Sequence, residues 1–151
     1  MANDLSNARR RDPYLGNRFR IALEVNGVEE GGFSECSGLV VETEFEERRE
    51  GGLNGYVHRF PKGTKFTNVI LKRGLIDSDR LWQWHQDLVA GQVTALNVSI
   101  ILRDPAGNDT KWKWHLERAY PVKWTGPEFK ADASAVAIET LELAHHGLKK
   151  G

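Results

Sequence analysis

The residues best suited to catalysis or metal binding are five histidines, one cysteine and a row of glutamates. The histidines stand at positions 58, 85, 115, 145 and 146, and no pair has the four-residue spacing of a helical zinc motif. The single cysteine, Cys36, excludes an internal disulfide and a cysteine zinc site. We therefore interpret the histidines as ordinary surface or half-buried residues and Cys36 as a small buried or half-buried side chain.

The glutamates lie in the stretch VVETEFEERREGG, residues 40–52, where they alternate with less polar residues. This alternation predicts a strand with a carboxylate face of Glu42, Glu44 and Glu46 and an opposite face of Val41, Thr43 and Phe45. Same-face side chains of a strand are about 7 Å apart, whereas hard cations prefer carboxylates and carbonyls of a bent loop. The sequence therefore predicts neither a metal site nor a cofactor.

Length and charge bound the class of protein. The chain has 151 residues, enough for about one domain, and 21 basic residues balance 21 acidic ones. A net charge near zero supplies no field that attracts nucleic acid or anionic lipid. The N-terminal residues lack the apolar core of a signal peptide, and no apolar run approaches the roughly 20 residues of a membrane span. We expect synthesis in the cytoplasm and no membrane anchor.

Most predicted elements are strands. Period-two patterns and turn signals such as Asn26-Gly27 predict strands over residues 19–25, 67–72, 96–103, 111–118 and 135–145, with a further run that ends at Phe33. A return strand is predicted from Tyr56 to Phe60, ended by Pro61, and the last strand is predicted to bulge near Thr140.

One helix is predicted over residues 78–90, capped by side chains of the cluster at 77–79 and ended by Gly91. Its inner stripe is Leu81, Trp84, His85 and Leu88. Seven or so strands and one helix predict a mainly β fold, an antiparallel β-sandwich or barrel with one flanking α-helix. The five tryptophans are interpreted mostly as core or subunit-interface residues.

The glutamate strand is unusually long for its apolar face. Residues 41–49 would span about 30 Å, yet the apolar face ends at Phe45. The end of the hairpin therefore protrudes, and a neighbouring subunit could receive it. Two interpretations of the carboxylate face follow: several copies join edge to edge into a large barrel with a water-filled bore, or the face is the solvated outside of a monomeric sandwich.

Several segments carry a resemblance to a known family. They are DPYLGNRFRIALEVNGVEEGGFSECSGL, VETEFEERREGGLNGYVHRFP, LKRG, LWQWHQDLVAG, PVKWTGPEF and AVAIETLELAHHGL, which together extend from Asp12 to Leu148. In this order they resemble the tail tube protein family of contractile-tail phages and contractile injection systems, an Hcp-like inner tube subunit. The resemblance implies hexameric rings whose sheets join into a ring-wide β-barrel. The rings would stack into a hollow conduit that sheath contraction drives through a target envelope, a structural role and not an enzymatic one.

The resemblance also assigns roles to parts of the chain. It implies an N-terminal arm of residues 1–14 and a single tube-subunit domain of residues 15–151. The arm would contact a neighbouring subunit through Arg10, Arg11, Asp12, Pro13 and Tyr14. The hairpin tip would make the contact between stacked rings through Arg48, Arg49, Glu50, Gly51, Gly52, Leu53, Asn54, Gly55 and Tyr56. The outer face of the helix would face the sheath through Asp79, Arg80, Gln83 and Asp87.

Alternation and the resemblance together make Glu42, Glu44 and Glu46 the candidates for the bore. The implied partners are further copies of the chain, a sheath protein, baseplate or tube-initiator and tail-terminator proteins, and a cargo of DNA or effector protein in the lumen. The subunit would be assembled into a phage tail or an injection particle; bacteriocins and secretion systems share it. Three alternatives stay open: a small-molecule-binding β-barrel, a tube-initiating baseplate paralogue, and an enzyme that uses His115 with a nearby carboxylate.

Overall fold

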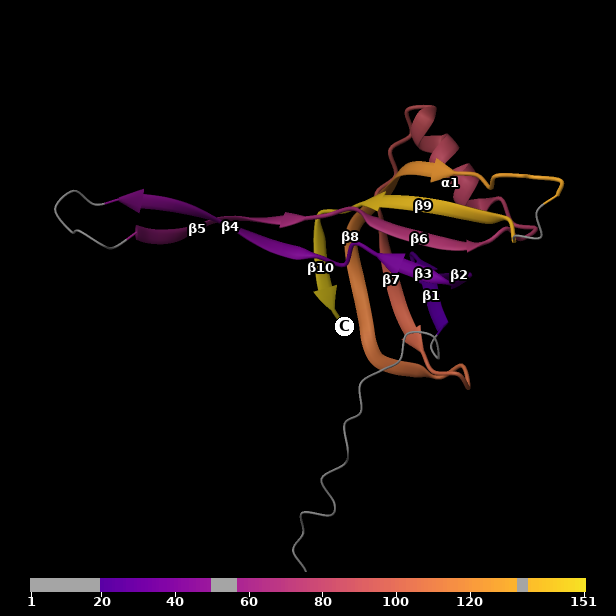
Figure 1. Cartoon of the computed structure of the whole chain (residues 1–151), viewed down its shortest axis with the longest axis horizontal. Coiled ribbons are helices and arrows are strands. Elements are labelled where there is room, and N and C mark those ends of the chain that lie inside the picture. Colours follow the sequence, from indigo (N-terminus) through magenta and orange to yellow (C-terminus); the bar gives the residue numbers. More distant parts are fainter. Residues whose placement is uncertain (1–19, 50–56, 133–135) are drawn as a thin grey trace, which may run out of the picture.

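The structure is a computed structural model that describes residues 20–49, 57–132 and 136–151 (Figure 1). Within these residues the chain forms ten strands and one helix, which confirms the predicted mainly β fold with one flanking helix. In chain order the elements are β1 (Arg20–Val25), β2 (Val28–Phe33), β3 (Glu35–Ser37), β4 (Val41–Arg49), β5 (Val57–Phe66), β6 (Val69–Gly74), α1 (Arg80–Val89), β7 (Leu96–Arg103), β8 (Asp109–Thr125), β9 (Ile138–Ala144) and β10 (Gly147–Lys150).

The body of the molecule consists of two antiparallel sheets that share one strand. The first has the order β2-β1-β7-β8, with β10 also paired to β8, and the second has the order β8-β9-β6-β3. The 17-residue strand β8 pairs with β7 through its first part and with β9 through its last part. It turns the corner beside Arg118, whose φ of 51° accompanies a shift in the β7–β8 register.

A second corner joins the opposite ends of the two sheets. Strands β2 and β3 are separated only by Ser34, yet β2 pairs with β1 and β3 pairs with β6. The Ser34 backbone N–H and hydroxyl both donate to the Lys72 carbonyl, at 2.9 and 3.0 Å. The chain therefore passes from one sheet to the other at this point, so that the two sheets enclose a common core.

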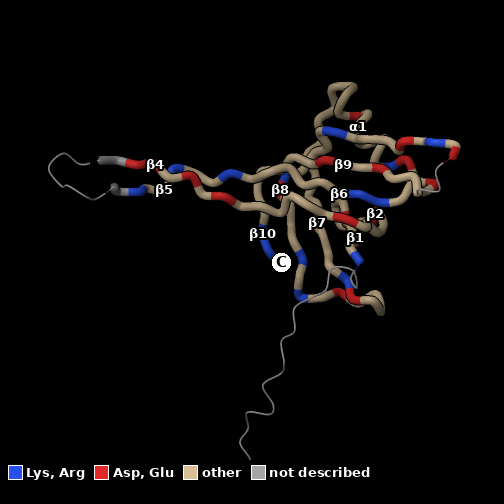
Figure 2. Tube along the Cα trace, in the orientation of Figure 1, with Lys and Arg blue, Asp and Glu red and all other residues tan. Residues whose placement is uncertain are grey.

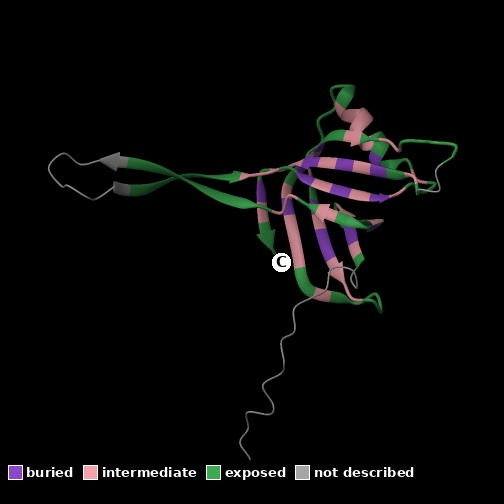
Figure 3. Cartoon of the chain, in the orientation of Figure 1, coloured by how far each residue is buried: buried purple, intermediate pink, exposed green. Residues whose placement is uncertain are grey.

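The core lies between these sheets, where alternate side chains of β1, β6, β7, β8 and β9 point inward and most of them are apolar. Figure 3 shows the buried residues gathered on β1, β6, β7, β8 and β9. Helix α1 covers one side of this core through Leu81, which is fully buried, and through Trp84, which packs against it. The buried cluster consists of Leu23, Phe33, Val69, Leu71, Leu81, Val98, Ile100, Leu116, Ala119, Leu141 and Leu143.

A buried ion pair links the second sheet to β2. Arg73 of β6 and Glu139 of β9 are each 3% exposed, and the Arg73 Nε donates to Glu139 Oε1. The Trp124 indole of β8 donates to the other carboxylate oxygen at 3.1 Å, and Arg73 Nη1 donates to the Glu30 carbonyl of β2 at 3.0 Å. The Arg73 guanidinium also lies 5.0 Å from the Phe33 ring centroid. Four strands therefore meet at one charge-assisted network.

The predicted end of the helix is confirmed, and the predicted capping at its start is wrong. Gly91 has φ +88°, and its N–H donates to the Leu88 carbonyl at 3.0 Å. At the other end the N-cap residue is Asp79, which makes no side-chain capping hydrogen bond. Its φ of −103° and ψ of 13° lie outside the β region from which an N-cap side chain reaches back over the free amides.

The predicted end of the return strand at Pro61 is also wrong, because β5 continues to Phe66. Pro61 lies opposite Phe45 while Gly63 lies opposite Glu44, so Lys62 is the extra residue of a bulge. A proline is tolerated here because β5 is an edge strand, where one side of the backbone needs no ladder hydrogen bond.

The bulge predicted near Thr140 does not occur in β9. The β6–β9 register is uninterrupted from Leu143 to Ile138, and the irregularity lies on β8 between Pro121 and Lys123. The bulge was predicted from an apparent shift of the apolar positions along the strand, but Ile138 is exposed and does not lie on the inner face. Glu139 occupies that face instead, where its pairing with Arg73 permits burial.

Candidate assembly interface

Strands β4 and β5 form a separate two-stranded ribbon that extends away from the body (Figure 1). They pair along their whole length, from Val41 opposite Phe66 to Arg49 opposite Val57. Among the described residues neither strand pairs with any strand outside the ribbon. The predicted long hairpin that outlasts the core is thus confirmed, and Figure 3 shows it exposed along nearly its whole described length.

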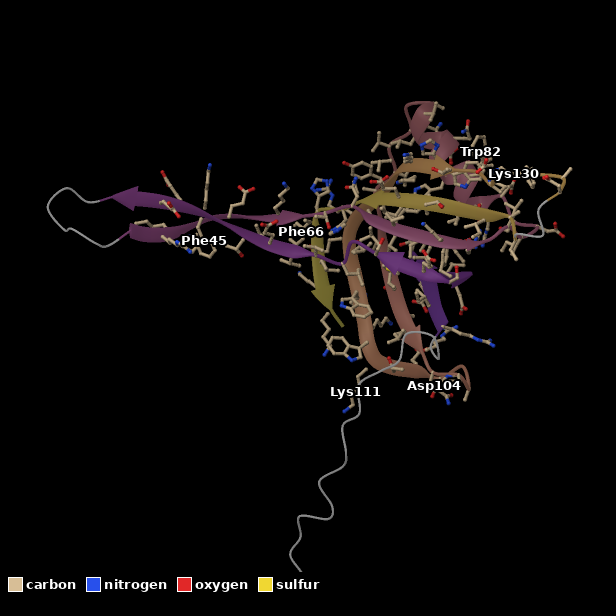
Figure 4. All side chains as sticks on the ribbon, in the orientation of Figure 1. Phe45, Phe66, Trp82, Asp104, Lys111 and Lys130 are labelled. Carbon is tan, nitrogen blue, oxygen red and sulfur yellow. The ribbon has the colours of Figure 1, made fainter. Side chains whose placement is uncertain are left out.

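The register defines the two faces of the ribbon, because directly opposed residues share a face. Glu42, Glu44 and Glu46 lie on one face together with Lys65 and with Phe60, which lies opposite Glu46. The other face carries Val41, which lies opposite Phe66, and Phe45, which lies opposite Pro61. Thr64 of β5 lies on the same face. Val41 is 53% exposed and Phe45 is 56% exposed, and Figure 4 shows Phe45 far out on the ribbon. The ribbon therefore presents an uncovered, partly apolar face and a carboxylate face.

Close contacts fix the base of the ribbon to the body. The Thr67 hydroxyl donates to the Gly38 carbonyl at 2.9 Å, which ties the two chain segments that enter and leave the ribbon. The His145 Nε2 lies 3.0 Å from the Thr67 carbonyl, and its ring packs against Phe66 with centroids 5.4 Å apart. Gly38 has φ +86°, a conformation that favours glycine. These contacts set the direction in which the ribbon leaves the body.

The helix residues expected to face outward lie around a groove rather than on a bare convex face. Arg80, Gln83 and Asp87 line a groove of about 310 Å³ between α1 and the neighbouring strands, whereas exposed Asp79 lies before the helix. Arg80 Nη1 is 3.2 Å from Glu30 Oε1, and the Gln83 amide donates to Asp87 Oδ1 at 3.1 Å. The groove is lined by Val25, Glu30, Arg80, Leu81, Gln83, Trp84, Asp87, Thr94 and Leu96.

The structure describes the surroundings of His115 and Cys36, two of the residues considered for catalysis. His115 Nδ1 lies 2.8 Å from the Ser99 hydroxyl, a different partner from the carboxylate that an enzyme was expected to use. The described part of the chain contains no cluster of three or more His, Cys, Asp or Glu residues that could hold a metal ion. Cys36 is a half-buried free thiol, and burial raises its pKa to about 11. A thiol with that pKa is a weak nucleophile near neutral pH.

The tryptophans form pairs within the molecule. Trp82 of α1 packs edge to face on Trp124 with ring centroids 4.7 Å apart, and Trp112 stacks on Trp114 at 5.6 Å. Lys150 Nζ lies 4.0 Å from the centroid of Trp112. Trp84, Trp114 and Trp124 pack against the core, as interpreted from the sequence, while Trp82 and Trp112 stay partly exposed.

Two sets of residues predicted to make contacts fall outside the described ranges. They are the arm residues Arg10, Arg11, Asp12, Pro13 and Tyr14 and the tip residues 50–56. Arg48 and Arg49 are described as the last two residues of β4. The sequence analysis did not single out the basic residues of β5, Arg59, Lys62 and Lys65. The sequence does contain this pattern, because the basic residues follow the hairpin tip along the chain and the glutamates precede it.

Solved structures with this architecture define the class of protein. The chain matches a chain of the sheath–tube complex of an extracellular contractile injection system, PVC, in the extended state, with 23% identity, TM-score 0.81 and coverage of 98% of this chain and 97% of the other. It matches a chain of the anti-feeding prophage baseplate with 25% identity, TM-score 0.74 and coverage of 91% and 95%. It matches Hcp1 from Flavobacterium johnsoniae with 15% identity, TM-score 0.53 and coverage of 87% and 96%. The fold is therefore that of Hcp-like tube proteins.

The family follows from a second comparison. The family model described as T4-like virus tail tube protein gp19 matches residues 16–149, nearly the whole chain. The chain belongs to this family, and the resemblance noted in the sequence is confirmed. A search of curated proteins found no match. The helix in the described part of the chain is too short and too polar to cross a membrane.

Proposed function

We propose that the protein is the structural subunit of the inner tube of a contractile tail or injection system. The observation that carries this proposal is the β4–β5 ribbon, which leaves the body with both faces exposed in a chain of the tail tube family. An isolated two-stranded ribbon is marginal in water, so a partner must cover it. In a homo-oligomer the partner is another copy of the same chain.

In the proposed tube, six copies form a ring, and their sheets join into one ring-wide β-barrel. The polar face with Glu42, Glu44 and Glu46 lines the bore, because a row of ionised carboxylates must stay hydrated. The opposite face with Val41 and Phe45 is covered by a neighbouring copy. Residues 1–14 act as an arm that contacts a neighbour, residues 15–151 form one domain, and residues 48–56 contact the next ring.

The partners of the tube follow from the same assignment. The matched structures include a sheath–tube complex and a baseplate, which supports a sheath protein and baseplate proteins as partners of this chain. We place the residues around the α1 groove, including Arg80, Gln83 and Asp87, on the outer wall against the sheath. Cargo, either DNA or an effector protein, would pass along carboxylate rings that repel phosphate and acidic surfaces. Synthesis would occur in the cytoplasm, before assembly into the particle.

We propose a structural rather than catalytic role for the chain. The half-buried Cys36 thiol is a poor nucleophile, and His115 has a serine hydroxyl as its partner. The tryptophans also support this proposal, because four of the five pair with each other and three pack against the core.

Gel filtration coupled to light scattering, followed by electron microscopy, tests this function. The expected result is hexameric rings or stacked tubes, with longer tubes when cognate sheath and baseplate proteins are present. Deletion of residues 50–54 should preserve rings and abolish stacking. A protein that stays monomeric at high concentration, even with sheath and baseplate proteins supplied, contradicts the tube role.

A further inference from the structure

Over most of its described length the ribbon carries charges of opposite sign on its two strands, although β4 ends with the basic residues Arg48 and Arg49. In residues 41–47 of β4 the charged side chains are Glu42, Glu44, Glu46 and Glu47, without a basic residue. In residues 59–66 of β5 they are Arg59, Lys62 and Lys65, without an acidic residue. In Figure 2 the red segments of the ribbon lie on β4 and the blue segments lie on β5.

Within one copy the opposite charges face each other. Glu42 lies opposite Lys65, and Glu47 lies opposite Arg59 with their Oε1 and Nε atoms 3.6 Å apart. The outer edge of each strand faces no further strand, because within the described residues β4 and β5 pair only with each other. The ribbon therefore has one acidic edge and one basic edge, and both can receive a further strand.

Symmetry limits how such ribbons can meet. Copies related by rotation about a ring axis place β4 of one copy next to β5 of the following copy, and the two strands run antiparallel, as within the ribbon. A two-fold pairing instead places β4 against β4, or β5 against β5. The first arrangement brings acidic residues next to basic ones, and the second brings like charges together.

We propose that this charge separation directs the ribbons of neighbouring copies to lie head to tail, β4 beside β5, and rejects the two-fold pairings. The inference rests on the proposed tube function and names the surface that orients its subunits. Single exposed ion pairs contribute little to affinity, so the rows act mainly by excluding wrong pairings. Like charges next to each other are costly even where opposite charges gain little.

Exchange of the two rows tests the proposal. A reversed variant carries Glu42→Lys, Glu44→Lys, Glu46→Lys and Glu47→Lys together with Arg59→Glu, Lys62→Glu and Lys65→Glu. In this variant the two strands of each ribbon still carry opposite charges, and so do the adjacent strands of neighbouring reversed copies. The reversed variant should therefore assemble with itself. Next to a native copy it places equal charges together, so native and reversed copies should form separate rings.

Energy transfer between differently labelled native and reversed copies measures the separation. We expect native–reversed neighbours to be about tenfold rarer than random mixing gives at low salt, and to reach the random level near 1 M salt, where charges are screened. The control variant has glutamine at the same seven positions, and it should mix with native copies at every salt concentration.

A second experiment leaves the charges unchanged. In two populations that both carry Cys36→Ser, one carries Thr43→Cys on β4 and the other Thr64→Cys on β5. A bifunctional maleimide should link position 43 of one copy to position 64 of another at least tenfold more often than 43 to 43 or 64 to 64.

The outcomes separate the two proposals. Native copies that assemble but mix freely with reversed copies at low salt overturn the head-to-tail proposal and leave the tube role intact. Copies that link mainly through identical positions overturn both, because two-fold contacts cannot close a six-membered ring. A reversed variant that folds but cannot assemble with itself also overturns it. If it does not fold, the crosslinks alone decide. A native protein that never assembles overturns the tube role and the head-to-tail proposal together.

Discussion

Gly38 is the residue at which the ribbon depends most directly on backbone geometry. A Cβ atom added to Gly38, at φ +86°, would lie 2.0 Å from the Asn68 carbonyl oxygen. Gly38→Ala should therefore lower the free energy of unfolding by about 3 kcal/mol, because the segment must move or adopt a strained conformation. Denaturant unfolding of the free subunit measures this change.

Gly63 provides the matched control in the same ribbon. A Cβ there would meet no atom within 4 Å. Gly63→Ala should change the free energy of unfolding by no more than about 0.5 kcal/mol. Equal losses for the two variants would contradict the close contact at the ribbon base.

Cys36 supplies a prediction that depends on pH. Burial raises its thiol pKa from 9.0 to about 11, so the folded protein keeps the proton at pH values where the unfolded chain loses it. The thiolate fraction at pH 8 is about a hundredfold smaller in the folded state, and iodoacetamide should react correspondingly slowly. Labelling in urea, where the thiol is exposed, provides the fast reference rate.

The same shift affects stability in alkaline solution. Well below pH 9 the thiol is protonated in both states and contributes almost no pH dependence. Between about pH 9 and 11 the unfolded chain binds fewer protons than the folded one, so the free energy of unfolding falls as the pH rises. Cys36→Ala should lack this part of the decline, and a parallel pH profile for both proteins would contradict it.

At the scale of elements, the buried ion pair joins strands that are distant in sequence. Glu139→Ala leaves the Arg73 charge buried without its partner, so it should cost about 3–5 kcal/mol of unfolding free energy. Glu142→Ala, three residues further along β9, removes an exposed hydrogen bond from Asn68 and should cost less than about 1 kcal/mol. Thermal unfolding of both variants compares these losses, and equal melting temperatures would show that the pair does not join the strands.

The elements differ in how far the sequence predicted them. The Asn26-Gly27 turn was predictable because both residues have positive φ, 52° and 81°, which Asn and Gly tolerate best. Gly91 ended the helix for the same reason. The corner of β8 was not predictable, since Arg118 carries no local preference for a positive φ, and the two sheets impose it.

The candidate interface was predictable in its pattern but not in its pairing. Alternation placed Glu42, Glu44 and Glu46 on one face, and the structure agrees with that face through the strand register. The sequence did not predict that β5 continues past Pro61. A proline is tolerated there because β5 is an edge strand, and the open edges of the ribbon are seen only in the structure. Burial of Glu139 could not be read from its strand because its partner, Arg73, lies 66 residues away in the chain.

At the scale of the whole molecule, the ribbon should matter for assembly and little for folding. Val41 and Phe45 are exposed in the single chain, so Val41→Ser with Phe45→Ser should change its unfolding free energy by less than about 0.5 kcal/mol. In the proposed assembly a neighbouring copy covers these side chains, so their loss should weaken association at least tenfold. Light scattering over a dilution series measures the association.

Val89 offers a control for this variant. It is 68% exposed on α1, away from the ribbon, so Val89→Ser should alter neither the fold nor the association of free subunits. Normal assembly of the Val41 and Phe45 variant would show that the apolar face of the ribbon is not an interface.

The sharing of β8 between both sheets has a mechanical consequence. In a sandwich whose sheets meet only through side chains, an axial load can slide one sheet over the other. Here 17 consecutive residues run through both sheets, so such sliding would have to break hydrogen bonds to β7 and β9 together. A tube wall built from this subunit therefore resists shear through its covalent backbone, and a thrust applied at one end reaches the other with little loss to deformation.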